Sequence, residues 1–376
     1  MPYPLVPNAS AAARTPRRWR VAALALLLPA AAWSAPPPAT TLGGRAVPEA
    51  ELRAWLQAAR ARHAIPGLAV ATVEGGALRS VIALGTADVE SGAPVTPDTR
   101  FEAASLSKPV FSRAWMVEVD AGRLSLDRPL AADGDDLGLG ADPRVATLTP
   151  RQLLSHAAGL PNWRERDGGP VAFVGEPGSG LAYSGEGYDA LARAMARTLR
   201  VDDAGLARHL AASTMPMGAT ARFGFLLEGC EAGKAAPHRD GARLPWTPCL
   251  DHVSAAGGLE ASPADYARWL VDAMAGRGLS AESDAAWWRG QGVTIPDDHP
   301  LRAHGLVDWS LGFAVHALPF GRTWVHTGDQ PGYTALALVA EDRQRALVVM
   351  TNADGAQAFL LALVGFLAAP DASVDP

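Results

Sequence analysis

The sequence predicts an α+β fold: one antiparallel sheet built from both ends of the chain, flanked by terminal helices, with a helical lobe inserted in the middle. Strand-like runs occur near residues 68–84 and return at residues 310–351. Between them the chain reads mainly as helices and long loops. Strands gathered at the two ends favour a single sheet over alternating strands and helices. We expect one lobe from residues 45–104 and 305–368, and a helical lobe from residues 105–304.

The first 35 residues are typical of an export signal. Arginines precede the apolar run of residues 21–32, and small residues follow it. That run is too short for a transmembrane helix, so we expect no stable membrane span once the signal is removed. Residues 36–44 are rich in proline and threonine, as in a flexible lead-in. The sequence therefore predicts a periplasmic or secreted protein.

Composition narrows the function classes. Of the 376 residues, 48% are hydrophobic and 19% are charged, enough to bury a large core. The net charge of −6, with no basic cluster after the signal, disfavours binding to nucleic acid. The only cysteines, Cys230 and Cys249, lie in a stretch rich in glycine and proline. Export favours a disulfide between them, and two free thiols are the alternative.

The predicted elements follow one another in a simple order. Apolar residues at helical spacing predict helices at residues 48–63, 110–120, 149–158, 187–199, 202–212, 263–275 and 357–367. Short apolar and β-branched runs predict strands at residues 68–73, 78–84, 310–316, 323–326, 334–340 and 346–351. The first two strands are joined by Glu74-Gly75-Gly76-Ala77, which indicates a hairpin.

The pair Ser105 and Lys108 is the strongest chemical signal in the chain. The residues stand three apart at the head of a predicted helix, so the hydroxyl lies within reach of the amine. A neutral amine can take the serine proton, and a charged amine can lower the pKa of a third group that does so. Among the 33 basic residues only Lys108 and Lys234 are lysines, and lysine, unlike arginine, can lose its proton inside a protein. The alternative is an N-cap serine followed by a solvated lysine.

Seven segments extend this observation along the chain: residues 66–70, 94–101, 105–108, 148–160, 183–188, 255–259 and 326–328. In this order they resemble the superfamily of serine β-lactamases and penicillin-binding proteins, in particular its branch of class C β-lactamases, D-peptidases and esterases. The resemblance covers nearly the whole chain after the signal. It implies a β-lactamase/transpeptidase-like fold, with the site where the sheet meets the helical lobe.

The resemblance implies a role for each matching residue. Ser105 is then the acylating nucleophile, Lys108 its partner, and Tyr183 a base or proton relay. We expect a neighbouring ammonium to lower the pKa of the Tyr183 phenol. The oxyanion hole would use the backbone N–H groups of Ser105 and Asp329. No metal or organic cofactor is expected.

His326, Thr327 and Gly328 fall where the family has lysine or histidine, then threonine or serine, then glycine. The resemblance implies that His326 is a hydrogen-bond donor whose charge depends on pH. It also implies that Thr327 binds a carboxylate or carbonyl group, and that Gly328 lets the substrate backbone approach closely.

Two departures from the family shape the functional expectation. Gly185 stands where asparagine is common, an amide that contacts substrate and lysine, and His326 replaces a fixed cation. Both favour an esterase or peptidase over an efficient β-lactamase. We expect an exported serine hydrolase that cleaves a small ester, a D-amino-acid peptide or a β-lactam through an acyl-Ser105 intermediate, so its partner is a small molecule or a peptidoglycan-derived substrate. The alternative is a weakly catalytic or non-catalytic protein that binds penicillin or peptidoglycan.

Overall fold

The computed structural model describes residues 38–130, 137–165, 169–213, 221–223, 233–246, 250 and 252–369. The predicted export signal and both cysteines, Cys230 and Cys249, lie outside the described residues. The described residues, all of which lie at position 38 or later, form one compact unit. Among the described residues, no helix has the length and apolar character needed to cross a membrane.

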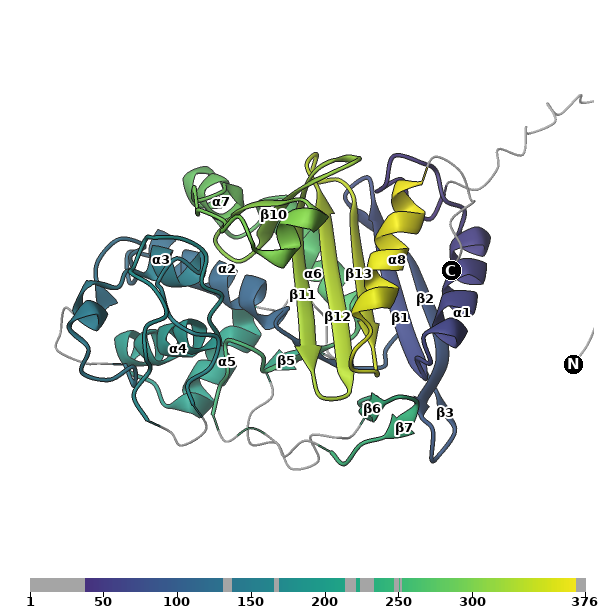
Figure 1. Cartoon of the computed structure of the whole chain (residues 1–376), viewed down its shortest axis with the longest axis horizontal. Helices are drawn as coiled ribbons and strands as arrows, with labels where there is room; N and C mark the ends of the chain where they lie inside the picture. Colours follow the sequence, from purple (N-terminus) through teal and green to yellow (C-terminus); the bar gives the residue numbers. More distant parts are fainter. Residues whose placement is uncertain are drawn as a thin grey trace, which may run out of the picture. The chain divides into compact units, whose positions relative to one another are not determined.

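An eight-stranded antiparallel sheet forms the centre of the fold, with the strand order β3-β2-β1-β13-β12-β11-β10-β9 (Figure 1). Its strands are β1 (Gly67–Glu74), β2 (Ala77–Asp88), β3 (Ala93–Pro94), β9 (Leu306–Trp309), β10 (Ala314–Leu318), β11 (Gly321–Gln330), β12 (Tyr333–Ala340) and β13 (Ala346–Thr351). The two ends of the chain meet where β1 pairs with β13, with Val70 opposite Val349. The predicted sheet built from both chain ends is therefore confirmed.

The terminal helices α1 (Glu49–Arg62) and α8 (Gln357–Ala368) cover one face of this sheet (Figure 1). Strand side chains alternate between the faces. On β1, Leu68 and Val70 belong to the same buried cluster as Trp55 of α1 and Phe359 of α8. Ala69, the residue between them, belongs to the core on the other face. This alternation explains why the sheet is buried on both sides.

Helix α6 (Pro263–Met274) covers the other face, where it contacts β1, β2 and β13. Its buried residues Tyr266 and Leu270 join the core that contains Ala69. The Tyr266 hydroxyl also donates a hydrogen bond to the Leu106 carbonyl at 3.0 Å. Residues 105–304 are predicted to form the helical lobe; α6 lies in that range and packs on the sheet.

The remaining described elements surround the nucleophile segment. The helices are α2 (Ser107–Asp120), α3 (Pro150–Leu154), α4 (Gly185–Leu199), α5 (Asp203–Ser213) and α7 (Ala281–Trp288), with 3-10 helices at Pro143–Thr147 and Pro300–His304. The short strands are β4 (Phe101–Ala104), β5 (Arg222–Phe223), β6 (His238–Arg239), β7 (Ala242–Arg243) and β8 (Leu259–Ala261). In Figure 1, α2 to α5 gather on one side of the large sheet.

Two predicted elements are shorter than expected, for local reasons. The helix predicted at residues 149–158 stops at Leu154, and His156 then has a left-handed φ of 57° that no helix continues through. The strand predicted at residues 310–316 begins only at Ala314, because Ser310 and Phe313 close a turn with hydrogen bonds in both directions.

Candidate active site

Ser105 occupies a tight turn between β4 and α2. Ala104 ends the strand with a φ of 49°, a conformation that is costly for a residue with a side chain. The Ser107 hydroxyl donates to the Ala104 carbonyl at 2.6 Å and accepts from the Leu259 N–H at 2.9 Å, which ties the turn to β8. The Ser105 hydroxyl caps no helix, since Leu106 is the N-cap of α2 and has no side-chain cap. The structure thus supports the catalytic interpretation of the serine over the capping one.

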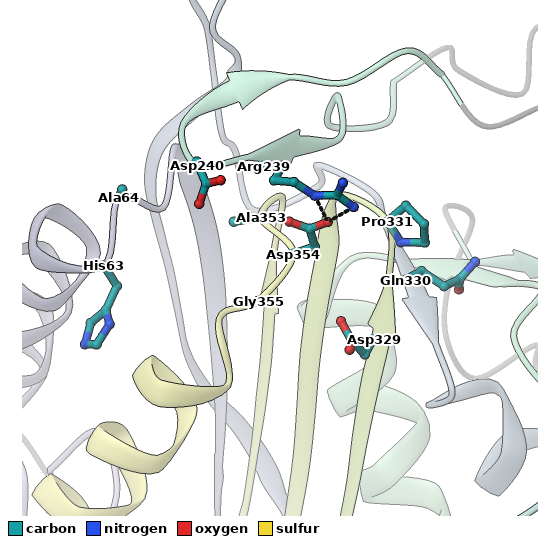
Figure 2. A pocket seen from close by; sticks show the side chains of 10 residues that line it. All are labelled: His63, Ala64, Arg239, Asp240, Asp329, Gln330, Pro331, Ala353, Asp354 and Gly355. Carbon is teal, nitrogen blue, oxygen red and sulfur yellow. Dashed lines mark hydrogen bonds and ion pairs between the residues drawn. The ribbon is translucent and has the colours of Figure 1, made fainter. Parts of the chain in front are cut away.

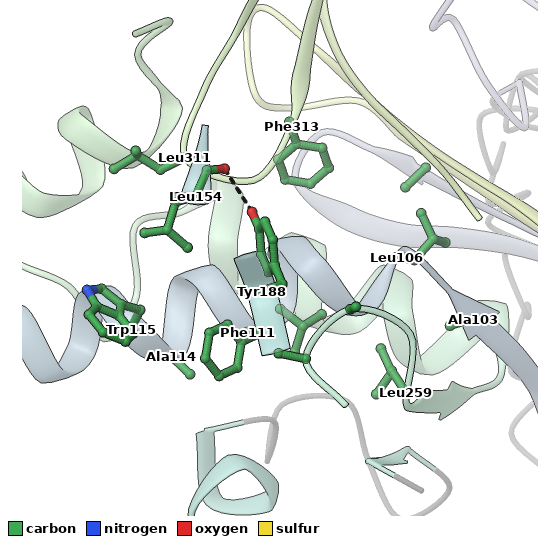
Figure 3. Packing of buried hydrophobic residues seen from close by; sticks show 14 of the residues in the cluster. Ala103, Leu106, Phe111, Ala114, Trp115, Leu154, Tyr188, Leu259, Leu311 and Phe313 are labelled. Carbon is green, nitrogen blue, oxygen red and sulfur yellow. Dashed lines mark hydrogen bonds between the residues drawn. The ribbon is translucent and has the colours of Figure 1, made fainter. Parts of the chain in front are cut away.

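The helix behind the nucleophile is almost fully buried. Phe111 and Trp115 of α2 pack in a cluster with Tyr188 of α4 (Figure 3). The Tyr188 hydroxyl donates to the Leu154 carbonyl at 2.9 Å, so its buried oxygen is satisfied. This packing fixes the first turn of α2, and with it Lys108.

Lys108 is buried against the nucleophile, with an exposed fraction of 1%. Its Nζ donates to the Ser105 hydroxyl at 3.0 Å and to the Ala256 carbonyl at 2.8 Å. Within the described part of the chain it makes no ion pair. Burial lowers the pKa of the Lys108 amine to about 7, and the negative charge of Asp189 opposes that shift. A substantial fraction of this amine is therefore neutral at neutral pH and able to accept a proton.

Tyr183 completes the set around the serine. Its hydroxyl shares a hydrogen bond with the Ser105 side chain, and its ring lies 4.8 Å from Lys108 Nζ. The His156 ring packs 4.2 Å away, and the His326 ring lies at 6.2 Å. Burial raises the pKa of the Tyr183 phenol, and the bond with Ser105 offsets this only in part. The expected lowering was wrong, because burial penalises the phenolate and Lys108 itself loses charge near pH 7.

His326 faces the same region from β11, in a state that differs from the expected one. Its Nδ1 lies 2.7 Å from the Thr327 carbonyl, so Nδ1 carries the proton and Nε2 is an acceptor. Burial and the Lys108 charge lower the pKa of His326 to about 3. The expectation of a pH-dependent donor was therefore wrong: at neutral pH this histidine is uncharged, and its buried Nε2 has no partner among the described residues.

The end of β11 offers a free edge beside the site. β10 pairs with β11 only as far as Val325, so residues 326–330 pair with β12 alone. Thr327 is exposed there. A side chain at Gly328 would overlap the Ala103 carbonyl oxygen and approach the Ala104 Cβ to 3.1 Å. The glycine thus allows the close approach of the nucleophile strand β4, and the close approach of a substrate backbone at Gly328 stays a prediction.

The Asp329 side chain lines a cavity of about 560 Å³ at one end of the sheet (Figure 2). The ion pair between Arg239 and Asp354, at 2.7 Å, lies in the same cavity. Burial and the Asp354 charge raise the pKa of the Asp329 carboxyl. The Asp329 carboxylate therefore belongs to the lining of this cavity. The role predicted for Asp329 in the oxyanion hole involves only its backbone N–H.

Gly185 is covered by Trp163. The Gly185 N–H donates to the Asn162 carbonyl at 2.9 Å and to the Asn162 Oδ1 at 3.0 Å, which places the next residue, Trp163, over the glycine. A Cβ at position 185 would lie 2.6 Å from the indole ring. Trp163 as a residue is 54% exposed, an unusual exposure for a tryptophan. The indole thus takes the space where the family commonly has an amide.

Sequence reasoning missed two groups that act on Lys108, the Ala256 carbonyl by a hydrogen bond and Asp189 by its charge. The Ala256 carbonyl lies in the segment 255–259 that carried the resemblance, but nothing in the sequence indicates which carbonyl accepts. Asp189 follows Tyr183 by six residues, and no sequence motif indicated a role for it.

Among the described residues, no three His, Cys, Asp or Glu side chains are grouped so that they could hold a metal ion.

Comparisons with known proteins identify the fold and the family. Esterase EstB of Burkholderia gladioli is 35% identical over 119 residues, which are 31% of this chain and only 29% of that relative. The crystal structure of SurE matches with a TM-score of 0.68 and 28% identity, covering 87% of this chain and 77% of SurE. A class C β-lactamase from Rhodobacter sphaeroides shares the fold, with a TM-score of 0.69 at 19% identity, covering 88% of this chain and 98% of that one.

The fold of this chain is thus the β-lactamase/transpeptidase fold, as predicted. The sequence profile of the family described as Beta-lactamase matches residues 52–368, which include every residue placed at the site above. This protein belongs to the Beta-lactamase family of serine hydrolases.

Proposed function

We propose that this protein hydrolyses small esters or D-amino-acid amides through an acyl-Ser105 intermediate, and that β-lactams are poor substrates. The observation that carries the proposal is the buried Lys108 amine, 3.0 Å from the Ser105 hydroxyl and with a pKa of about 7. A serine next to a partly neutral amine is an activated nucleophile.

The chemistry follows from the positions of the groups. Neutral Lys108 accepts the Ser105 proton as the serine oxygen attacks the substrate carbonyl carbon, and the carbonyl oxygen becomes an oxyanion. Backbone N–H groups of Ser105 and Asp329 would bind that oxyanion. Tyr183, whose phenol stays protonated, relays a proton to the leaving group as the acyl-enzyme forms. Lys108, neutral again once the leaving group is protonated, then takes a proton from a water that attacks the acyl carbon; the bond to the serine oxygen breaks, the acyl group leaves as the acid, and Lys108 returns the proton to Ser105.

The charge of the site supports the proposed substrate class. A β-lactam carries a carboxylate, which binds best to a fixed cation. His326 is neutral at neutral pH and its Nε2 is a buried acceptor, so this residue supplies no cation for a carboxylate. An ester or amide substrate without a carboxylate does not need a fixed cation, so a neutral histidine at position 326 does not weaken its binding. Similarity to an esterase supports ester substrates. Similarity to SurE, which is 28% identical and whose structure was solved with D-Leu, supports D-amino-acid substrates.

The test is a comparison of kcat/KM for three substrates: p-nitrophenyl butyrate, D-leucine p-nitroanilide and nitrocefin. We expect turnover of the first or second to exceed that of nitrocefin at least about tenfold, the effect of losing one charge-assisted contact of about 1.4 kcal/mol or more. Faster hydrolysis of nitrocefin would refute the proposed substrate class.

Gly185 supports a second candidate, a protein that acylates with penicillin and turns over slowly. Gly185 has no side chain that could bind an acyl group, and the Trp163 ring covers its position. A stable penicillin adduct with no turnover of any of the three substrates would favour this function.

Export is part of the proposal and rests on the sequence of residues 1–35. N-terminal sequencing of the protein expressed in a Gram-negative host would test it. Cleavage near residue 35 together with periplasmic recovery is the expected result, and an intact N-terminus in the cytoplasm would contradict it.

A further inference from the structure

Asp189 is a buried carboxylate close to the catalytic lysine, in a position that the mechanism above does not use. It lies on α4 and is 8% exposed. Its Oδ1 accepts hydrogen bonds from the Ala256 N–H and from the Ser254 hydroxyl, both at 3.1 Å. In the described part of the chain it makes no ion pair. Burying a carboxylate without a paired cation is costly, so an arrangement of this kind is informative.

The Ala256 residue connects this carboxylate to the site. Its N–H is bound by Asp189, and its carbonyl accepts from Lys108 Nζ at 2.8 Å. The Ser254 hydroxyl, which donates to Asp189, also accepts from the Gly257 N–H at 3.2 Å. Three hydrogen bonds thus fix the loop whose carbonyl holds the lysine.

We propose that Asp189 is a positioning residue: it fixes the Ala256 carbonyl, which in turn aims the Lys108 amine at the Ser105 hydroxyl. It acts through the loop and does not itself touch the reacting atoms. The inference rests on the proposed function, since it needs an activated Ser105.

The charge of Asp189 also affects the pKa of Lys108, and with it the pH dependence of Ser105 labelling. Five titratable groups face Lys108 from the elements around it: His156, Tyr183, Tyr188, Asp189 and His326. Of these, only Asp189 raises the pKa of Lys108. The histidines are held neutral by burial, since the pKa of His156 lies well below its ordinary value and that of His326 is about 3. Removing the carboxylate charge should therefore make Lys108 less basic.

The test compares Asp189→Asn with wild type by the rate at which a fluorophosphonate labels Ser105 between pH 5 and pH 9. Asparagine keeps an oxygen for the Ala256 N–H and removes the charge. The labelling rate should fall at acid pH as Lys108 becomes protonated, and we call this part of the pH–rate profile the acid limb. In Asp189→Asn we expect the acid limb to move to lower pH by roughly 0.5–1 unit. On the plateau we expect labelling to slow about tenfold, because the amide is a weaker acceptor than the carboxylate and the carbonyl is held less firmly.

The matched control is Asp284→Asn, an aspartate that is also 8% exposed but pairs with Arg113 and Arg343 instead. It should leave the acid limb unmoved. A second variant, Ser254→Ala, removes the Ser254 contact with Asp189 and its bond from the Gly257 N–H without removing charge, so the plateau should fall while the limb stays in place. If Asp189→Asn does not fold, an unchanged plateau in Ser254→Ala overturns the proposal.

The outcomes separate the two claims. If wild type is not labelled at all, the proposed function fails. If wild type is labelled with an acid limb and Asp189→Asn has the same limb and the same plateau, the positioning role of Asp189 is overturned. A loss of stability with the limb and the plateau both unchanged would identify Asp189 as a purely structural residue.

Discussion

Lys108 should be a source of instability as well as of activity, and Lys108→Met tests both. Burial lowers the pKa of this amine from 10.5 to about 7. A shift of 3.5 units corresponds to about 5 kcal/mol between the charged and neutral forms. Below pH 7 the folded protein must hold a charged amine in its interior. Methionine has a similar length and no charge, so the variant avoids that cost.

The sign of the pH effect follows from proton binding. Between pH 7 and pH 10.5 the unfolded chain holds a proton on Lys108 that the folded protein lacks, so stability rises with pH. Below pH 7 both states hold the proton, and the contribution is constant. From pH 6 to pH 9 the wild type should therefore gain about 2.7 kcal/mol that Lys108→Met does not.

The assay is urea unfolding of both proteins at pH 6 and pH 9. The variant should be inactive, and its stability relative to wild type should fall by about 2.7 kcal/mol between pH 6 and pH 9. Packing changes and the two lost hydrogen bonds are the same at both pH values, so they cancel. A relative stability that does not change with pH would refute the low pKa of Lys108.

The other buried lysine provides the control. Lys234 pairs with Glu102 at 2.8 Å and with Glu260 at 3.0 Å. Lys234→Met leaves both carboxylates without this partner, so it should lose about 3–5 kcal/mol at both pH values. The two lysines should thus respond in opposite directions at pH 6.

Three further predictions concern the site. The kcat/KM of the wild type should fall about tenfold per pH unit below pH 7, because Lys108 must be neutral to accept the proton; a rate independent of pH between 5 and 7 would contradict this. Gly328→Ala should lose about 1–3 kcal/mol of stability in urea unfolding, because its Cβ overlaps the Ala103 carbonyl. Gly257→Ala is the matched control, with its nearest neighbour atom at an ordinary 3.4 Å, and equal losses in both variants would be evidence against the close approach at Gly328. Gly185→Asn should displace the Trp163 ring and speed acylation by penicillin relative to esters, whereas Gly185→Ala displaces the ring without adding an amide; equal effects would mean that the amide has no role.

The architecture could be predicted from the sequence because its signals are periodic and local. Leu68 and Val70 alternate with Ala69 in the sequence as they do between the two cores. Strands β4 and β8 were not predicted, because three or four residues are too few to show a period. Helix α6 was predicted as a helix, but its position on the sheet depends on contacts between residues far apart in the chain.

The sequence predicted which residues form the site but not the protonation states of their side chains. Ser105, Lys108, Tyr183 and His326 are brought together as the motifs indicated. Their protonation depends on burial, and spacing does not reveal it: the lowering expected for the Tyr183 pKa was wrong, and so was the expectation that the charge of His326 changes near neutral pH. The scarcity of lysine was also ambiguous, since buried Lys234 is held by two carboxylates and lies outside the mechanism.

The central claim is that Ser105 is an activated nucleophile, and intact mass spectrometry tests it most directly. Wild type and Ser105→Ala are each incubated with a fluorophosphonate and, separately, with a labelled penicillin. We predict one fluorophosphonate adduct on wild type and none on Ser105→Ala, with thermal stability nearly unchanged by the substitution. A wild type that gains no mass with either reagent, or an adduct that persists without Ser105, would contradict the account.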